Sequence, residues 1–252
     1  MDLNVGVNGV WLFGREPAGG HGFVIDPDGL EGLDDGLGVR GDSVARPQAH
    51  GDFDVPTFFE PRIVALSGTC VAGSAQKLGW FRDQFKTMLV NGGRVSFDHL
   101  GTVRWGDARL APGTQPKFKV DSGDSLSARF QIQLKFANPR LFGETRTFAA
   151  GTPAHHFGNF AATPVHTVTG VNASGYTING PDGKTFTVSR AVTAGVPHVI
   201  DMATGLLKVG GAVVVGAVTS GDLWAIPGGA QVTHALTGSG LTLSTAVTDT
   251  YV

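Results

Sequence analysis

The sequence predicts a mainly β protein built of two domains, and three observations lead to that prediction. Charged residues are frequent in the first part, 31 of 143, and rare in the last part, 9 of 109. The first part contains one amphipathic helix pattern, whereas the second consists of short runs rich in Val, Thr and Gly. The change falls at 137–143, Ala-Asn-Pro-Arg-Leu-Phe-Gly. We therefore expect domains at residues 1–143 and 144–252.

The helix pattern of the first domain begins after Ser74, a residue type that caps helix N-termini. Asn91-Gly92-Gly93 is expected to end it, because these residues tolerate left-handed backbone. The pattern has one apolar face, which predicts that the helix packs on a sheet. This face is formed by Leu78, Phe81, Phe85 and Leu89 and is widened by Trp80 and Met88.

Strand patterns surround this helix, so the first domain is expected to be α+β, a sheet or sandwich with one packed helix. Residues 127–136 alternate strictly, which predicts one face in a core and one face in water. Residues 27–52 are rich in Gly and Asp and are expected to form a long loop. The predicted strands are 3–13, 21–26, 62–71, 94–98, 101–109, 117–120 and 127–136.

Short strands separated by turn sequences predict an antiparallel sandwich or jelly roll for the second domain. Gly210-Gly211 is expected to form a hairpin turn between two of them. The predicted strands are 164–171, 176–179, 185–188, 198–202, 206–209, 212–218, 223–226, 231–236 and 241–247.

Composition excludes several classes of protein. The formal net charge is −2 and no basic stripe is visible, which argues against sequence-specific nucleic-acid binding. No apolar run reaches the roughly 18 residues of a membrane helix, and the N-terminus has no signal-peptide pattern. We therefore expect no membrane insertion. We expect the protein to be synthesised in the cytoplasm. Cys70 is the only cysteine, so no internal disulfide exists, and we expect it buried on a strand.

Motifs that resemble chemical sites lack the context that such chemistry needs. Residues 36–41 match G-x-G-x-x-G but have no strand before them and no helix after them. His155-His156 has no third metal ligand nearby. Asp201 and Asp222 are glycosidase candidates by their scarcity, but a strand end and a turn explain them better. We expect no catalytic, cofactor or metal residues, and no enzyme.

The order of motifs along nearly the whole chain resembles the distal tail protein (Dit) family of siphoviruses. In the first domain the resemblance rests on 36–40 followed by His50-Gly51, on 62–69 followed by the helix 74–89, and on 130–136 running into 137–142. In the second domain it rests on 157–159, 162–170, 201–205, 223–229 and Thr250-Tyr251.

The resemblance implies a structural virion protein at the tail tip, made in the bacterial host. In this family the N-terminal domains form a homohexameric ring, and galectin-like C-terminal β-sandwiches extend from its edge. One face of the ring meets the tail tube, formed by the major tail protein. The other face meets the baseplate hub or a fibre-bearing protein, and the tape-measure protein is a further partner. DNA passes through the lumen. The inserted carbohydrate-binding module of some members is not visible after Pro164.

The resemblance also points to site residues. Arg40, His50 and Gly51 are predicted to contact a neighbouring subunit, because the hydrophilic segment 27–60 is too long to fold alone. The seam Asn138, Pro139, Arg140, Leu141 and Phe142 is predicted to set the geometry between the domains. Ordinary loop structure is the alternative for both sets.

Two rival functions remain open at this point. A carbohydrate-binding sandwich that adsorbs to host glycans would stack sugar rings on Tyr176, Phe186 or Trp224, whereas core positions are the alternative for all three. A cell-wall hydrolase would depend on Asp201.

Overall fold

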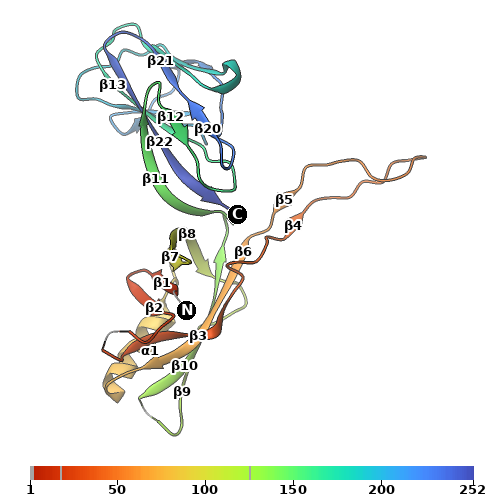
Figure 1. The fold of residues 1–252 in the computed structure, drawn as a ribbon, viewed down its shortest axis with the longest axis vertical. Coiled ribbons are helices and arrows are strands. Elements are labelled where there is room, and N and C mark those ends of the chain that lie inside the picture. The colour runs from red at the N-terminus through yellow and green to blue at the C-terminus, as the bar shows by residue number, and fades with distance from the viewer. Residues whose placement is uncertain (1–2, 18, 125) are drawn as a thin grey trace. The chain divides into compact units, whose positions relative to one another are not determined.

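The computed structural model describes residues 3–17, 19–124 and 126–252, and these are mainly β, which confirms the predicted class (Figure 1). The chain forms two compact units, one ending at Leu141 and including Val252, the other spanning Phe142–Tyr251. Each unit is described by itself.

The first unit contains one α-helix within its described residues. Its elements are β1 (Leu3–Val7), β2 (Val10–Phe13), β3 (Gly22–Glu31), β4 (Val39–Arg40), β5 (Phe58–Phe59), β6 (Arg62–Val71), α1 (Ala75–Thr87), β7 (Gly93–His99), β8 (Thr102–Leu110), β9 (Lys117–Val120) and β10 (Ser127–Phe136).

The main sheet of this unit closes on itself. Its strands follow the order β8-β7-β1-β2-β3-β6-β10, and β10 pairs again with β8 through Leu134 and Lys135. Only the β2–β3 pair is parallel among these strands as described. β9 pairs with the other half of the same edge of β10. Closure leaves few unpaired strand edges, which limits uncontrolled association.

β10 has the predicted bounds and the predicted alternation. Every second side chain from Ala128 to Phe136 is buried, whereas Arg129 and Gln131 on the opposite face are exposed. The inner face carries the core, and the outer face of the closed sheet remains polar.

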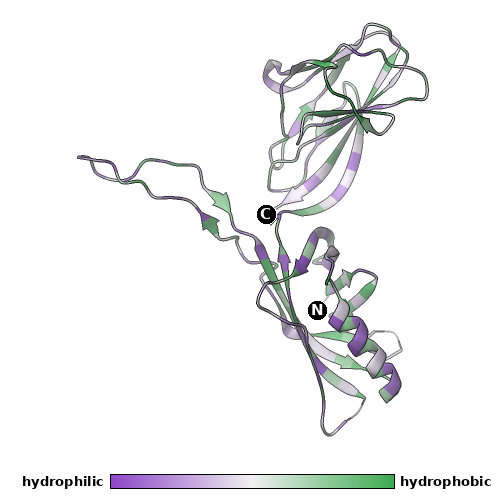
Figure 2. Cartoon of the chain, turned by 180° about the vertical axis from the view of Figure 1, so that it is seen from behind, coloured by the Kyte–Doolittle hydropathy of each residue, from purple (hydrophilic) through white to green (hydrophobic). Residues whose placement is uncertain are grey.

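The predicted cap of α1 is confirmed, since the Ser74 side chain accepts a hydrogen bond from the Lys77 backbone N–H at 3.2 Å. Hydrophilic and hydrophobic residues alternate along the helix ribbon (Figure 2). Leu78 and Phe85 are buried, and the Phe85 ring lies 5.4 Å from Phe130 and 5.9 Å from Phe118. The helix therefore covers the inner face of β9 and β10.

Two details of the helix prediction are wrong. Trp80 is 48% exposed rather than part of the buried face, and Lys77 lies over its ring at 3.9 Å. The helix ends at Thr87 instead of near Asn91, because Leu89 turns into left-handed backbone with φ of 59°. That turn buries the Leu89 side chain, and burial compensates for the backbone strain.

β3 is longer than predicted, because the expected loop begins inside it. Its pairing with β6 shifts register between Ile25 and Leu30, a bulge that accommodates Pro27. A Cβ on Gly29 would lie 2.1 Å from the Ser67 carbonyl oxygen, so only glycine fits there.

The second unit consists of strands and one short 3-10 turn. Its elements are β11 (Leu141–Ala149), β12 (Pro153–His155), β13 (Val165–Gly170), β14 (Tyr176–Asn179), η1 (Pro181–Gly183), β15 (Thr185–Val188), β16 (His198–Asp201), β17 (Leu206–Val209), β18 (Ala212–Val213), β19 (Val218–Gly221), β20 (Gln231–Thr233), β21 (Ala235–Thr237) and β22 (Leu241–Tyr251).

Two sheets share the main core of this unit. One has the order β18-β17-β16-β13-β22-β11, and the other has the order β19-β15-β14-β21. Ile200 and Leu243 of the first sheet belong to the same buried cluster as Ile178 and Phe186 of the second. β12 and β20 form a separate pair.

Several strand predictions in this unit need correction. The predicted strand 212–218 ends at Val213, because Gly216 adopts φ of 80° before β19 begins. The predicted strand 223–226 is reduced to a single bridge between Ile226 and Ala162. β11 and β12 were not predicted. The Gly210-Gly211 turn is confirmed, with positive φ at both residues.

Candidate assembly interface

A long hairpin, here called the arm, connects β3 to β6 and comprises residues 32–61 (Figure 1). β4 and β5 pair within it, and a bridge joins Ala45 to Asp52 nearer its tip. Gln48 and Gly51 have positive φ at the tip, where the chain reverses. At about 3.3 Å per residue, fifteen extended residues reach roughly 50 Å. The arm therefore extends far beyond the radius of an ordinary hydrophobic core.

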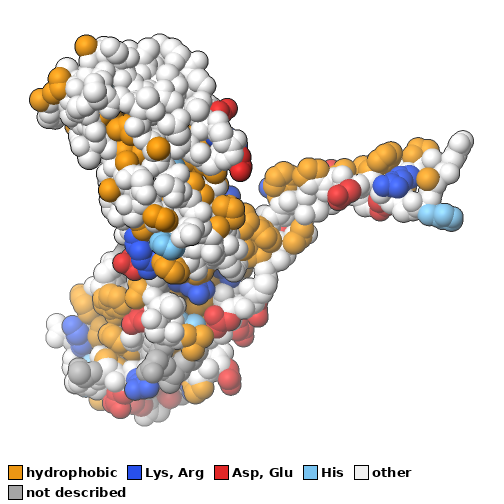
Figure 3. Space-filling model, turned by 45° about the horizontal axis from the view of Figure 1, so that its top comes forward, with side chains coloured by type: hydrophobic (Ala, Val, Ile, Leu, Met, Phe, Trp, Pro, Cys, Tyr) orange, Lys and Arg blue, Asp and Glu red, His pale blue; other side chains and the backbone are white. Residues whose placement is uncertain are grey.

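Hydrophobic side chains are exposed along the arm (Figure 3). Phe58 is 63% exposed, and Val39, Val44, Phe53 and Phe59 are exposed as well. A cluster of exposed aromatic and aliphatic residues on one element is typical of a protein interaction surface.

The arm and its approach from β3 are also strongly acidic. Residues 27–60 contain eight Asp or Glu and two Arg. Acidic side chains keep a segment with exposed apolar residues in solution, and they also select the charge of its partner.

The three residues predicted for subunit contact all lie on the arm and are exposed. Arg40 is in β4 opposite Phe58, whereas His50 and Gly51 are at the tip, so the three do not form one cluster. Phe53 and Phe58 were not predicted as interface residues. An apolar pair, Phe58-Phe59, inside a polar segment was the available signal.

Arg62, the first residue of β6, fixes the base of the arm. Its side chain is 4% exposed and donates hydrogen bonds to the carbonyl oxygens of Gly32 at 3.3 Å, Leu33 at 2.8 Å and Pro139 at 3.2 Å. Burial, together with the nearby charge of Arg104, lowers the pKa of this guanidinium. Three carbonyl acceptors compensate for the loss of water around the cation.

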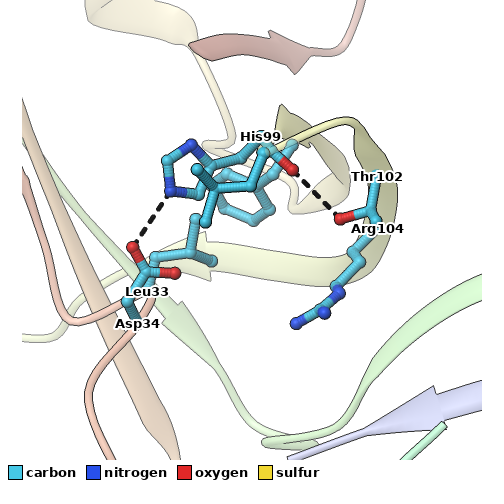
Figure 4. A pocket seen from close by; sticks show the side chains of 7 residues that line it. Leu33, Asp34, His99, Thr102 and Arg104 are labelled. Carbon is cyan, nitrogen blue, oxygen red and sulfur yellow. Dashed lines mark hydrogen bonds and ion pairs between the residues drawn. The ribbon is translucent and has the colours of Figure 1, made fainter. Parts of the chain in front are cut away.

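A small cavity of about 160 Å³ lies between the arm base and the β7–β8 turn (Figure 4). The His99 Nε2 atom lies 3.0 Å from the Asp34 carboxylate, and the Thr102 hydroxyl donates to the His99 carbonyl oxygen at 3.0 Å. Leu33 and Arg104 line the same cavity. These contacts and those of Arg62 hold the start of the arm, residues 32–34, to the closed sheet.

The predicted seam joins this arrangement through Pro139. The Asn138 side chain accepts the Arg140 backbone N–H at 3.3 Å, which closes a local turn. Leu141 is buried at the end of the first unit, and Phe142 begins the second. The link between the seam and the arm base through Arg62 was not predicted, because it joins residues 77 positions apart.

The aromatic residues considered for sugar stacking lie in the core of the second unit. Tyr176, Phe186 and Trp224 are at most 4% exposed. The Tyr176 hydroxyl lies 3.2 Å from His198 Nδ1, and the Trp224 N–H donates to His234 Nε2 at 3.1 Å. A ring that stacks on a sugar needs one exposed face, and these rings have none.

The acids considered for hydrolysis support turns. Asp201 accepts the Ala203 backbone N–H at 2.8 Å, and Asp222 accepts the Thr185 N–H at 2.9 Å. Both carboxylates therefore have structural partners, which accounts for their presence in an acid-poor unit.

His155 and His156 point into different surroundings. His156 is buried and its Nε2 accepts the Thr250 backbone N–H at 3.0 Å, whereas the exposed His155 stacks on Phe157.

Residues 3–17, 19–124 and 126–252 contain no group of three or more potential metal ligands. In the same ranges, no helix has the length and apolar character to cross a membrane. Cys70 is fully buried, which raises the pKa of its thiol to about 12.

Comparison with known proteins gives a match in structure alone. No protein-family model and no curated protein matches the sequence. The crystal structure of the Dit protein of phage SPP1 is similar over 99% of both chains, with a TM-score of 0.75 and 13% identity. This chain has the Dit fold. A chain of the phage P2 baseplate in its activated conformation with calcium is also similar, with a TM-score of 0.52 and 6% identity over 98% of this chain and 97% of that one. The sequence resemblance to Dit proteins thus extends to the three-dimensional fold.

Proposed function

We propose that this protein is a structural, non-enzymatic component of a phage tail tip, where six copies form an adaptor ring. The observation that carries the proposal is the match to SPP1 Dit over 99% of both chains. That protein is described as a paradigm of the hub adsorption apparatus of phages that infect Gram-positive bacteria. The matched region includes both units, so the likeness extends beyond a shared β module.

The arm supports self-assembly of the first unit, residues 1–143 in the domain division that we propose. It exposes apolar side chains such as Phe58 at a distance from the closed sheet, and these need a partner surface. An arm that docks on a different surface of the next copy makes a head-to-tail contact. If each copy makes this contact with the next, and the last copy makes it with the first, the result is a closed ring with cyclic symmetry.

In this proposal the ring joins the tail tube protein on one face to the hub or fibre-bearing protein on the other. The tape-measure protein is a further neighbour, and DNA crosses the lumen during ejection. The second unit, residues 144–252, is a galectin-like β-sandwich. Two sheets that share one core support this assignment. The buried rings of Tyr176, Phe186 and Trp224 give no support to direct glycan binding.

Native mass spectrometry of the purified chain tests the ring. We expect a hexamer for the wild type and a monomer when residues 36–58 are replaced by a short Gly-Ser linker. Phe157→Ser, which removes a 62% exposed aromatic residue from the second unit, is the matched control and should remain hexameric. A wild-type chain that stays monomeric at high concentration and binds neither tube nor hub protein would overturn the proposal.

A further inference from the structure

The outer surface of β8, β9 and β10 is strongly basic. On β10 the helix α1 covers the face that carries Phe130, and the opposite face carries Arg129 and Lys135. Residues paired directly across antiparallel strands share a face, so the neighbouring strands add further cations. This cationic face consists of Arg109, Lys117, Lys119, Arg129 and Lys135.

Cations face one another across the strands of this surface. Arg129 lies directly opposite Lys119 in the register of β10 and β9, and Lys135 lies directly opposite Arg109 in that of β10 and β8. Like charges directly opposite in a sheet are destabilising. Arg129 has an acidic partner, Asp26 at 2.7 Å. Within residues 3–17, 19–124 and 126–252, the other four cations form no ion pair.

Two open grooves follow the cationic face. One, of about 360 Å³, is lined by Lys117, Gln131 and Gln133. The other, of about 640 Å³, is lined by Arg109 and Lys135 and by one acidic residue, Asp107, so its charged lining is net basic. The outer face of the sheet therefore has room for an extended chain, as well as the charge to attract an acidic one.

The arm matches this surface in both charge and shape. Residues 32–61 of the arm contain six acidic and two basic residues. The same unit thus carries an anionic element and a cationic face on which only Arg129 has an ion-pair partner among the described residues. The arm is extended and narrow, as a groove along strands requires. Complementary patches of this kind steer association and fix its register.

We infer that the arm of one copy lies along the cationic face of the next copy. This inference rests on the proposed ring and names the surface that receives the arm. The arm's carboxylates neutralise the opposed cations of β8, β9 and β10. Its apolar side chains pack into the grooves and are thereby removed from water. Acidic arm and basic face occur once each per chain, which is the stoichiometry that a closed ring needs.

The DNA duplex is the other anion that a cationic face could attract. The arm is favoured because it needs a partner for its exposed Phe53 and Phe58, which a phosphate backbone does not provide. Packing by a protein segment satisfies both its charges and its apolar side chains.

Charge reversal tests the inference in the full-length chain. Lys117→Glu/Lys119→Glu reverses the face, and Asp42→Lys/Asp54→Lys reverses the arm without removing Asp52, which holds the Ser43 hydroxyl. Each pair should raise the dissociation constant of the ring interface about tenfold, measured by analytical ultracentrifugation at low salt. The four changes together should restore most of the affinity, because the charges are again complementary. At 1 M salt, where screening acts within about 3 Å, the differences should shrink.

Lys184→Glu/Lys208→Glu, two cations of the second unit, is the matched control and should leave ring assembly unchanged. A wild-type ring that neither reversal weakens would overturn this inference and leave the proposed function standing. A wild-type chain that never assembles would overturn both. The assembled wild-type ring could instead bind duplex DNA. If Lys117→Glu/Lys119→Glu abolished that binding and left assembly intact, the face would be assigned to DNA and the arm contact would be overturned.

Discussion

Acid should destabilise the second unit through a buried histidine pair. His166 and His234 are at most 2% exposed, and their ring centroids lie 4.8 Å apart. His234 Nε2 accepts the Trp224 N–H, so this nitrogen carries no proton in the folded state. His166 Nδ1 lies 2.9 Å from the Thr245 hydroxyl. Protonating His234 at Nε2 would break the bond to the indole and place a charge in the core.

The direction of the effect follows from the pKa values. Burial, and for His166 also the neighbouring His234, lowers the pKa of His166 to about 3, and burial lowers that of His234 to about 4. The unfolded chain has ordinary histidines with a pKa of about 6.5. The stability of the neutral pair is therefore complete above pH 6.5 and is lost as the pH falls towards the folded values. From pH 7 to pH 5 the free energy of unfolding therefore falls by about 2 kcal/mol for each histidine, or about 4 kcal/mol for the pair.

Urea unfolding of the full-length chain measures this loss. Trp224 is the only tryptophan of the second unit, so its fluorescence reports on that unit when Trp11, Trp80 and Trp105 are replaced by Phe. We expect the unfolding free energy from this signal to fall by at least 3 kcal/mol from pH 7 to pH 5.

His166→Gln/His234→Gln separates the histidine pair from other causes. Glutamine can accept the Trp224 N–H but does not titrate, so this variant should lose most of the pH dependence while being less stable at pH 7. A residual slope is expected from His156 and His198, whose pKa values burial also lowers. A wild-type loss below 1 kcal/mol, or an unchanged slope in the variant, would refute the reasoning.

Four further changes test the first unit by urea unfolding. Arg62→Met should cost about 3 kcal/mol, because it leaves buried carbonyl oxygens without a donor; an unchanged stability would mean that water replaces the guanidinium. Ser74→Ala should cost about 1 kcal/mol through loss of the helix cap, and no effect would contradict that role. Gly68→Ala should cost about 3 kcal/mol, since its Cβ would lie 2.0 Å from the Val24 carbonyl oxygen. Gly79→Ala, in open space on the helix, should instead stabilise by about 0.5–1 kcal/mol.

The elements that sequence predicts best are those whose pattern is local. The bounds of β10 and the alternation from Ala128 to Phe136 follow from period two alone, and the start of α1 follows from Ser74. β11 was missed because it is largely exposed and carries Glu144 and Arg146, so it lacks a buried stripe. Its partner β22 lies about 100 residues away, and Arg146 pairs there with Asp249 at 2.6 Å.

The candidate interface was predictable only in outline. A long acidic segment indicated an arm, but the hairpin depends on pairing between residues such as Val39 and Phe59 with weak strand patterns. The cationic face was hidden by the near-neutral total charge. It depends on the register that places Lys119 opposite Arg129, and no local rule fixes a register between strands that a loop separates.

The burial of Cys70 has a practical consequence for observing assembly. Because the chain's only thiol is inside the closed sheet and has a raised pKa, thiol-reactive dyes will not label the native protein there. A cysteine introduced at the arm tip, for example His50→Cys, would therefore be the single labelled site. Energy transfer from a donor there to an acceptor on another copy would follow ring closure in real time, without first replacing the native Cys70.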